Sequence, residues 1–465
     1  MKKHLITLLL LLFYLILLTQ LGNARVTAHG TLSTTINDSL KKKFPTLYSP
    51  EDVGLSSVIL NRIDSIAKAS IENKIFPGCQ VFIIKDGKPI YDKCFGNYTY
   101  ETNQKVKPTT LYDLASLSKT TGTLLAIMKL YDNGKLKLTD KASLYLSFLK
   151  GTDKENISIT DLLFHETGLP GSLDFHNLVL EKNKTPYFIA STKDSTNTVK
   201  LNSNTLRYKN EWVSKTPTKE FTLQVSDSFY LHNRFHNAAM QMIANTRLGS
   251  KTYLYSCINF ILLKEIAETI SGLSMDVFLN NEFFRPMNLS NIAYLPLRKH
   301  PKDDIAPTLK KDFLRNGLIQ GYVHDPAAAF LGGVSGNAGL FATSRDVASV
   351  YQMLLNNGEL DGKRYISAET CLIFTTTISA SGRRGLGFDK PVPSVPEHNP
   401  CCKSAPSEVF GHTGYTGTCC WTDPVNKIVY VFLSNRTYPN DGINKLAKMS
   451  IRPKIQEVIY QSIKK

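Results

Sequence analysis

Two pairs of short β-rich runs, one pair near each end of the chain, constrain the fold most. Residues 79–95 form two β-rich runs on either side of Asp86-Gly87, a dipeptide that tolerates the positive φ angles of a tight hairpin turn. Residues 416–434 repeat this arrangement around Asp423-Pro424. We therefore predict two antiparallel hairpins, and we expect both ends of the chain to share one sheet.

Helical patterns flank these strands and dominate the middle of the chain. Residues 56–74 place apolar side chains at helical spacing after two serines that can cap the helix, and residues 443–463 read as a closing helix. We expect an α/β fold in which terminal helices flank an antiparallel sheet, with an all-helical lobe inserted at about 115–355. The helices expected in this lobe cover residues 116–131, 159–164, 258–270 and 347–355.

Residues 171–250 differ from the rest of the inserted segment. Lys, Asn and Thr dominate here, and apolar residues recur only weakly at helical or strand spacing. Long connections of this kind are uncommon inside compact domains and are often functional. We expect a lid or an insertion rather than a part of the core.

The first residues have the features of a secretory signal peptide. Two lysines precede an apolar run from Leu5 to Leu18, and small residues follow it, including Ala24. An uncleaved membrane anchor is the alternative, but the run is shorter than the about 20 residues that a spanning helix needs. We expect residues 1–24 to be a signal peptide, 25–49 a flexible tether and 50–465 the folded domain of an exported, periplasmic or secreted protein without a stable membrane anchor.

The composition restricts the class of protein and its partners. Hydrophobic residues make up 42% of the chain, which excludes a mainly disordered protein. A net charge of +16 favours anionic partners, and charge alone does not choose among nucleic acid, phospholipid headgroups and acidic wall polymers. The eight cysteines lack zinc-site spacing, so we interpret them as small buried thiols. A bridge from Cys401-Cys402 to Cys419-Cys420 is the alternative.

Three short motifs carry the candidate chemistry. Ser116 and Lys119 form an S-x-x-K motif at the start of a helix, where a separation of three places both side chains on one face and directs Ser118 elsewhere. A lysine whose pKa is lowered by burial can take the serine proton. The second motif contains Tyr255 and Cys257, just before another helix. The third is Phe410-Gly411-His412-Thr413-Gly414-Tyr415, which enters a strand.

In this order the motifs resemble those of the penicillin-recognising serine hydrolases: class C β-lactamases, D-Ala-D-Ala carboxypeptidases and related esterases. The resemblance covers roughly residues 50–460 and implies a two-lobe β-lactamase-like fold without a metal or cofactor. It implies Ser116 as the nucleophile, Lys119 as its proton partner and Tyr255 as the general base. The oxyanion hole would consist of the backbone amides of Ser116 and Tyr415. The residues implied to bind substrate are Cys257, His412, Thr413 and Gly414.

Two positions depart from the family pattern. Cys257 stands where the family has Asn or Asp, so the site lacks the amide or carboxylate that would hold Lys119 and a substrate amide. His412 replaces the more usual lysine. An unperturbed histidine has a pKa near ~6.5, so we expect His412 to be largely cationic at pH 6 and neutral at pH 8, and to bind a substrate carboxylate more weakly as the pH rises.

The local sequences around the motifs look most like the cell-wall muropeptide amidase branch. They predict an exported acyl-serine hydrolase that acts on peptidoglycan-derived amides, at muramyl-L-Ala or D-amino-acid peptide bonds, with β-lactams as acylating ligands and no role for nucleic acid. A carboxylesterase of the same family, or a non-catalytic wall-binding or β-lactam-sensing protein, is the alternative. His232 and His236 would be ligands in a third alternative, a metal hydrolase, although no third ligand is evident in the sequence.

Overall fold

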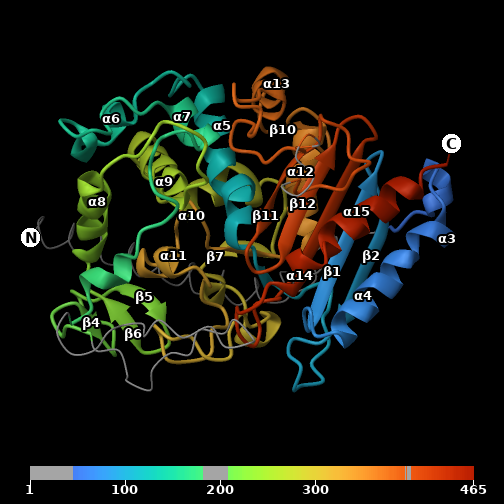
Figure 1. The fold of residues 1–465 in the computed structure, drawn as a ribbon, viewed down its shortest axis with the longest axis horizontal. Coiled ribbons are helices and arrows are strands. Elements are labelled where there is room, and N and C mark those ends of the chain that lie inside the picture. The colour runs from blue at the N-terminus through green and yellow to red at the C-terminus, as the bar shows by residue number, and fades with distance from the viewer. Residues whose placement is uncertain (1–45, 182–207, 393, 395–398, 465) are drawn as a thin grey trace, which may run out of the picture. The chain divides into compact units, whose positions relative to one another are not determined.

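A five-stranded antiparallel sheet joins the two ends of the chain. The structure is a computed structural model that describes residues 46–181, 208–392, 394 and 399–464. The strands run in the order β11-β12-β13-β1-β2 (Figure 1). Their bounds are β1 Gly78–Lys85, β2 Lys88–Gly96, β11 Phe410–Gly414, β12 Thr418–Asp423 and β13 Ile428–Ser434.

Both predicted hairpins are confirmed, and so is their common sheet. β1 pairs with β13 from Cys79 opposite Ser434 to Lys85 opposite Ile428. The β1–β2 turn needs positive φ angles at Asp86 (52°) and Gly87 (74°), which Asp and Gly tolerate better than bulkier residues.

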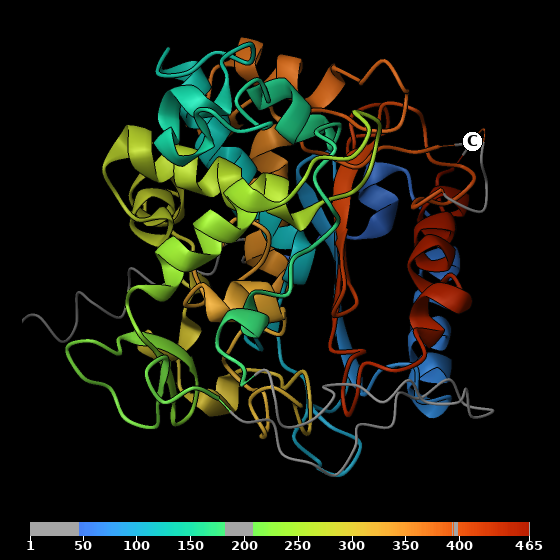
Figure 2. The ribbon, with the colours of Figure 1, turned by 60° about the vertical axis from the view of Figure 1, so that its left-hand side comes forward.

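Helices from both ends of the chain cover one face of this sheet. Figure 2 shows the sheet nearly edge-on, with these helices on one side and the inserted lobe on the other. They bury an apolar core against the strands. Each large apolar side chain that is fully buried there stabilises the fold by about 1.5–3 kcal/mol relative to an exposed one. The two predicted terminal helices are each divided, the second at Ser450, whose φ is 49°. These helices are α3 Ser57–Leu60, α4 Arg62–Glu72, α14 Lys445–Lys448 and α15 Ile451–Gln461.

The opposite face of the sheet carries α12 and, beyond it, the inserted lobe. α12 (Ser344–Leu355) contacts β1, β12 and β13, and nearly all of its side chains are buried. The predicted helix at 116–131 begins as a short 3-10 turn, continues as a π-helical turn at Lys119–Thr123 and ends as α5. The helices of the lobe are α5 Leu124–Asp132, α6 Ala142–Tyr145, α7 Ile159–Phe164, α8 Phe235–Asn245, α9 Cys257–Ser271, α10 Met275–Leu279, α11 Pro326–Phe330 and α13 Ala368–Thr376.

The expectation of an all-helical lobe needs correction, because the lobe also contains small antiparallel sheets. One has the order β3-β8-β7 and leads directly to Ser116, and another has the order β4-β6-β5. These strands are too short to show a clear period in the sequence. Their bounds, with those of a two-stranded pair, are β3 Tyr112–Asp113, β4 Val213–Ser214, β5 Leu223–Ser226, β6 Phe229–Leu231, β7 Ile292–Tyr294, β8 Leu340–Ala342, β9 Glu359–Leu360 and β10 Lys363–Arg364.

The lid expected at 171–250 also needs correction over the part that is described. Residues 208–250 contain the β4-β6-β5 sheet and α8, and the side chains of Leu231, Phe235 and Ile243 are fully buried. α8 packs on two 3-10 turns, Ser147–Leu149 and Phe175–Leu178. This segment therefore forms a small core of its own; residues 182–207 lie outside the described part.

The N-terminal predictions fall almost entirely outside the described residues. Residues 1–24 and 25–45 are not described, and the first regular element of the described part is a 3-10 turn at Pro50–Val53. Within the described ranges, no helix is long and apolar enough to cross a membrane. All eight cysteines are described; they are free thiols, and six of them are buried.

Candidate active site

A strained turn presents Ser116. Ser116 follows β3 in a 3-10 turn, and the preceding Ala115 has a φ of 47°, which is costly for a residue with a Cβ. The Ala115 N–H donates to Asp113 Oδ1 at 2.8 Å, and the other Asp113 oxygen accepts from the His324 N–H at 2.6 Å. Burial raises the pKa of Asp113 to about 6, although both of these hydrogen bonds lower it. A buried carboxyl thus holds the backbone of the serine in its strained conformation.

Lys119 lies against Ser116 as the S-x-x-K spacing predicts. Its ammonium donates to Ser116 Oγ at 3.0 Å and to the Asn337 carbonyl at 2.9 Å, and the side chain is 0% exposed. The same nitrogen lies 3.5 Å from Cys257 Sγ. Ser118 points away, and its hydroxyl accepts from the Leu340 N–H. A serine and a buried cation therefore share one pocket with the Cys257 thiol.

The protonation state of Lys119 differs from the expectation. Burial lowers the pKa of Lys119, but the neighbouring Cys257 and Tyr255 groups raise it, and the pKa ends above its usual value. Lys119 could take the serine proton only if burial lowered its pKa, and the net direction in this site is the opposite. Lys119 is an ammonium at neutral pH, which makes it a hydrogen-bond donor to the serine oxygen.

Tyr255 lies over the same ammonium. Lys119 Nζ is 5.1 Å from the centroid of the Tyr255 ring, and the His165 ring packs on that ring at 4.7 Å. Burial raises the pKa of the phenol, whereas the Lys119 ammonium lowers it, and the net direction is upward. The hydroxyl is buried, and the described residues offer it no hydrogen bond of good geometry. Ser116, Lys119 and Tyr255 thus converge as the resemblance implies.

β11 brings the third motif against the serine turn. A Cβ at Gly414 would lie 2.3 Å from the Leu114 carbonyl oxygen and 2.0 Å from Thr418 Oγ1, so only glycine allows this approach. β11 packs directly on the 3-10 turn of Ser116. Tyr415, the next residue, is half exposed, and its ring stacks on the Arg436 guanidinium at 4.2 Å. The start of the serine turn and the end of β11 therefore face the same space.

His412 is not the pH-dependent cation that its unperturbed pKa predicts. The side chain is 3% exposed and its Nδ1 lies 2.6 Å from the Thr413 carbonyl oxygen. Burial, followed by the charge of Arg384, lowers the pKa of His412 to about 3. His412 is therefore neutral between pH 6 and pH 8. Because it does not lose a proton in this range, the expectation that carboxylate binding weakens from pH 6 to pH 8 through His412 needs correction.

Two charged residues beside the site were missed in the sequence. Arg384 is 1% exposed and forms an ion pair with the buried carboxyl of Asp389 at 3.0 Å. Its guanidinium lies 5.7 Å from the centroid of the Tyr255 ring. The only signal in the sequence is an arginine pair in the glycine-rich stretch Ser381–Asp389, which does not distinguish a buried arginine from an exposed one.

The two candidate metal ligands have other partners. His236 Nε2 pairs with Glu265 at 2.9 Å, and His232 Nδ1 accepts from the Arg234 N–H at 3.1 Å while its ring packs on Trp212 and Phe221. Among the described residues, no group of three or more His, Cys, Asp or Glu side chains is placed to hold a metal ion. The histidines do not converge with each other or with Ser116.

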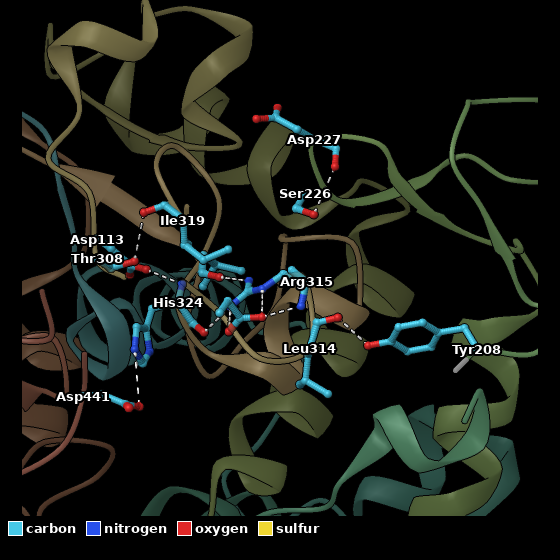
Figure 3. A network of polar contacts seen from close by, with 12 residues as sticks. Asp113, Tyr208, Ser226, Asp227, Thr308, Leu314, Arg315, Ile319, His324 and Asp441 are labelled. Atoms are coloured by element: carbon cyan, nitrogen blue, oxygen red, sulfur yellow. Dashed lines mark hydrogen bonds and ion pairs between the residues drawn. The ribbon is translucent and has the colours of Figure 1, made fainter. Parts of the chain in front are cut away.

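A buried polar network supports the serine turn from behind (Figure 3). Arg315 pairs with Asp312 at 3.0 Å and donates to the carbonyls of Val323 and His324. This fixes the loop whose His324 N–H holds Asp113. Figure 3 shows the His324 ring between Asp113 and Asp441, with His324 Nε2 3.7 Å from the Asp441 carboxylate.

The buried histidines predict acid sensitivity. Burial, together with the Arg315 charge, lowers the pKa of His324 to about 3, and His412 has a similar value. In the unfolded chain both histidines take up a proton near pH ~6.5, whereas in the folded protein they stay neutral down to about pH 3. The free energy of unfolding therefore falls as the pH drops from about 6.5 toward 3, by about 1.4 kcal/mol per pH unit for each histidine. The free energy of unfolding, measured with urea between pH 4 and 7, should show this slope. His324→Asn should reduce the slope by the contribution of one histidine, because one proton fewer is taken up on unfolding. An unchanged slope in the variant would contradict a neutral His324.

The serine turn, the buried ammonium and the two-lobe fold together define a serine hydrolase. Residues 63–449 match the family described as Beta-lactamase, and the chain belongs to that family. A protein from Escherichia coli O157:H7 named "Putative D-alanyl-D-alanine carboxypeptidase" is 31% identical over 85% of this chain and 87% of its own. The N-acetylmuramyl-L-alanine amidase of Bacillus subtilis (strain 168) is 28% identical over 85% of both chains.

Solved structures show the same fold at low sequence identity. A class C β-lactamase superposes with a TM-score of 0.58 at 19% identity, over 87% of this chain and 98% of its own. EstCE1, a hydrolase with promiscuous acyltransferase activity, superposes with a TM-score of 0.60 at 17% identity, over 86% and 98%. The β-lactamase-like fold predicted from the sequence is confirmed.

Proposed function

We propose that this serine hydrolase cleaves amide bonds in peptidoglycan fragments, at the muramyl-L-Ala bond or at a peptide bond to a D-amino acid. The observation that carries the proposal is the buried Lys119 ammonium 3.0 Å from Ser116 Oγ, with Tyr255 above it. The substrate class is proposed because relatives spanning most of the chain are named as a muramyl amidase and as carboxypeptidases.

In the proposed acylation, Tyr255 acts in its phenolate form, paired with the Lys119 ammonium: it takes the proton from Ser116 Oγ as that oxygen attacks the scissile carbonyl. The Lys119 ammonium favours both steps, because it donates to the serine oxygen as that oxygen gains negative charge and lowers the pKa of the phenol against the effect of burial. Tyr255 then gives the proton to the leaving nitrogen as the C–N bond breaks. In deacylation, the Tyr255 phenolate takes a proton from the water that attacks the ester, and returns it to Ser116 Oγ as the bond between that oxygen and the acyl carbon breaks.

The oxyanion of each tetrahedral intermediate would be bound by the backbone N–H groups of Ser116 and Tyr415. This assignment is supported by the close packing of β11 on the serine turn, which Gly414 permits. Thr413, Gly414 and Cys257 would line the substrate pocket, and β-lactams would acylate the same serine.

An ester is the second candidate substrate, and Cys257 is the observation that favours it. Its thiol lies 3.5 Å from Lys119 Nζ at the position where the family pattern has an amide or a carboxylate. A thiol is a weak hydrogen-bond donor and acceptor, so a substrate amide loses a partner there, whereas an ester does not need one.

Digestion of purified muropeptides, with the products identified by mass, tests the proposed function. Release of an intact peptide from the sugar indicates the muramyl-L-Ala bond, and loss of a single D-amino acid indicates carboxypeptidase activity. Ser116→Ala should abolish either product. Cleavage of neutral esters alone would favour the esterase, and retention of muropeptides without turnover would favour a wall-binding protein.

Cys257→Asn provides a sharper test of the amide preference. The added amide should donate to a substrate carbonyl and accept from Lys119, so we expect amide turnover to rise about 10-fold, a gain of the size of one hydrogen bond. Ester turnover should change little. Rates on matched amide and ester substrates give the comparison, and lower turnover on every amide would mean that the thiol has its own role.

The place of action is also a proposal. We propose that residues 1–24 direct export and are removed, that 25–49 tether the domain of residues 50–465, and that the hydrolase meets its substrate outside the cytoplasm. The signal-peptide pattern and the wall-related names of the relatives support this. N-terminal sequencing of the protein recovered from the producing cells would give the mature start.

A further inference from the structure

Polar atoms without hydrogen bonds gather around the Tyr255 ring. The His165 ring lies 4.7 Å from it, the His412 ring 5.9 Å and the Arg384 guanidinium 5.7 Å. Within the described part of the chain, one buried atom of each of these three side chains has no hydrogen-bond partner: His165 Nε2, His412 Nε2 and Arg384 Nε. Such atoms are uncommon in a protein interior, and each calls for an explanation.

The Arg384 guanidinium is held in a fixed position relative to β11. It pairs with Asp389 at 3.0 Å and donates to the Gly387 carbonyl at 3.3 Å. The Asp389 backbone in turn pairs with Gly411, the residue before His412, through hydrogen bonds of 2.8 and 3.2 Å. Arg384 therefore cannot move far from His412 without breaking the attachment of its loop to β11.

His412 itself does not supply a positive charge. The Thr413 carbonyl can only accept, so the contact at 2.6 Å places the proton of the neutral imidazole on Nδ1 and leaves Nε2 as an acceptor. The charged and titratable groups that face this imidazole are Arg384, Asp389, Lys119, Tyr255 and His165. Burial and the two cations lower the pKa of His412, while Asp389 opposes them. Lys119 and Arg384 are the two cations that contact the Tyr255 ring, at 5.1 and 5.7 Å, and both act on His412.

We propose that Arg384 is a positioning residue: its buried guanidinium, against the Tyr255 ring, supplies the fixed positive charge that the family pattern places on a lysine at position 412. The guanidinium keeps Tyr255 in place over Lys119 and favours its anionic form during proton transfer. This inference rests on the proposed role of Tyr255 as the proton carrier. It assigns Arg384 a part in turnover rather than in substrate binding.

The test separates kcat from KM on a neutral nitrophenyl ester between pH 5 and 9. Arg384→Gln should lower kcat about 10- to 30-fold, the scale of a desolvated cation–π interaction, and leave KM within about twofold. Arg384→Lys should retain most of the activity because the charge remains. Adding His412→Lys to Arg384→Gln should recover much of the lost kcat, because it returns a cation to the other side of the ring.

Arg383 offers a matched control. It also binds Asp389, at 2.6 Å, but its guanidinium lies over Tyr253 at 5.2 Å instead of Tyr255. Arg383→Gln should leave kcat nearly unchanged. Equal losses in Arg383→Gln and Arg384→Gln, an effect on KM alone, or no recovery on adding His412→Lys would each overturn the proposal.

A second readout does not depend on turnover. In histidine-labelled protein, the NMR signal of His412, identified by its loss in His412→Asn, should titrate at higher pH in Arg384→Gln than in the wild type, because a repelling cation is gone. Arg383→Gln should not shift it comparably. An unshifted signal in Arg384→Gln overturns the inference even if the hydrolase is active. A shifted signal in a protein that hydrolyses no ester or muropeptide would instead remove the proposed function.

Discussion

Ser116→Ala should lower turnover by about 10⁴-fold or more, which is the scale on which the loss of a catalytic serine acts. Ser116 Oγ lies 3.0 Å from the Lys119 ammonium, whereas the hydroxyl of the neighbouring Ser118 accepts from the Leu340 N–H. A fluorophosphonate or a slowly hydrolysed β-lactam should add one covalent adduct to the wild type. Intact-protein mass and peptide mapping would place the adduct on Ser116.

Ser118→Ala is the matched control for this substitution. It removes a hydroxyl two residues away from the same segment, and we expect labelling and turnover to persist. Labelling that survives Ser116→Ala, or disappears only in Ser118→Ala, would show that the nucleophile is assigned to the wrong residue.

Lys119→Ala should slow acylation by about 100-fold or more, the usual contribution of a proton-transfer partner. The substitution removes the donor to Ser116 Oγ and the positive charge that lowers the pKa of Tyr255. The measurement is the rate of the burst phase on an activated ester, which reports acylation separately from deacylation.

Lys119→Arg distinguishes the role of the positive charge from that of the hydrogen bonds that the ammonium donates. An arginine keeps the charge, but its planar guanidinium does not reproduce the compact ammonium that donates to both Ser116 and Asn337. We therefore expect Lys119→Arg to remain strongly impaired. Acylation at the wild-type rate in Lys119→Ala would show that Lys119 does not take part in the chemistry.

Local sequence patterns were sufficient to predict the central sheet and the contact between the candidate catalytic motifs. The hairpins at 79–95 and 416–434 depend on short β-rich runs and on the turn residues between them, and both signals lie within a few residues of each other. The contact between Ser116 and Lys119 follows from a spacing of three residues on one helical turn. Tyr255 was found through the order of the motifs, which also predicted the family.

The tertiary structure decided the charges of the site and the form of the inserted lobe. His412 is neutral because it is buried beside Arg384, and Lys119 keeps its proton because Tyr255 and Cys257 face it. The β4-β6-β5 sheet has strands too short to leave a period in the sequence. Burial and long-range charge depend on residues far apart in the chain, such as Arg384 and Tyr255, whose proximity no local pattern records. The sequence by itself therefore determined which groups meet at the candidate site, whereas their protonation states depend on how the two lobes enclose them.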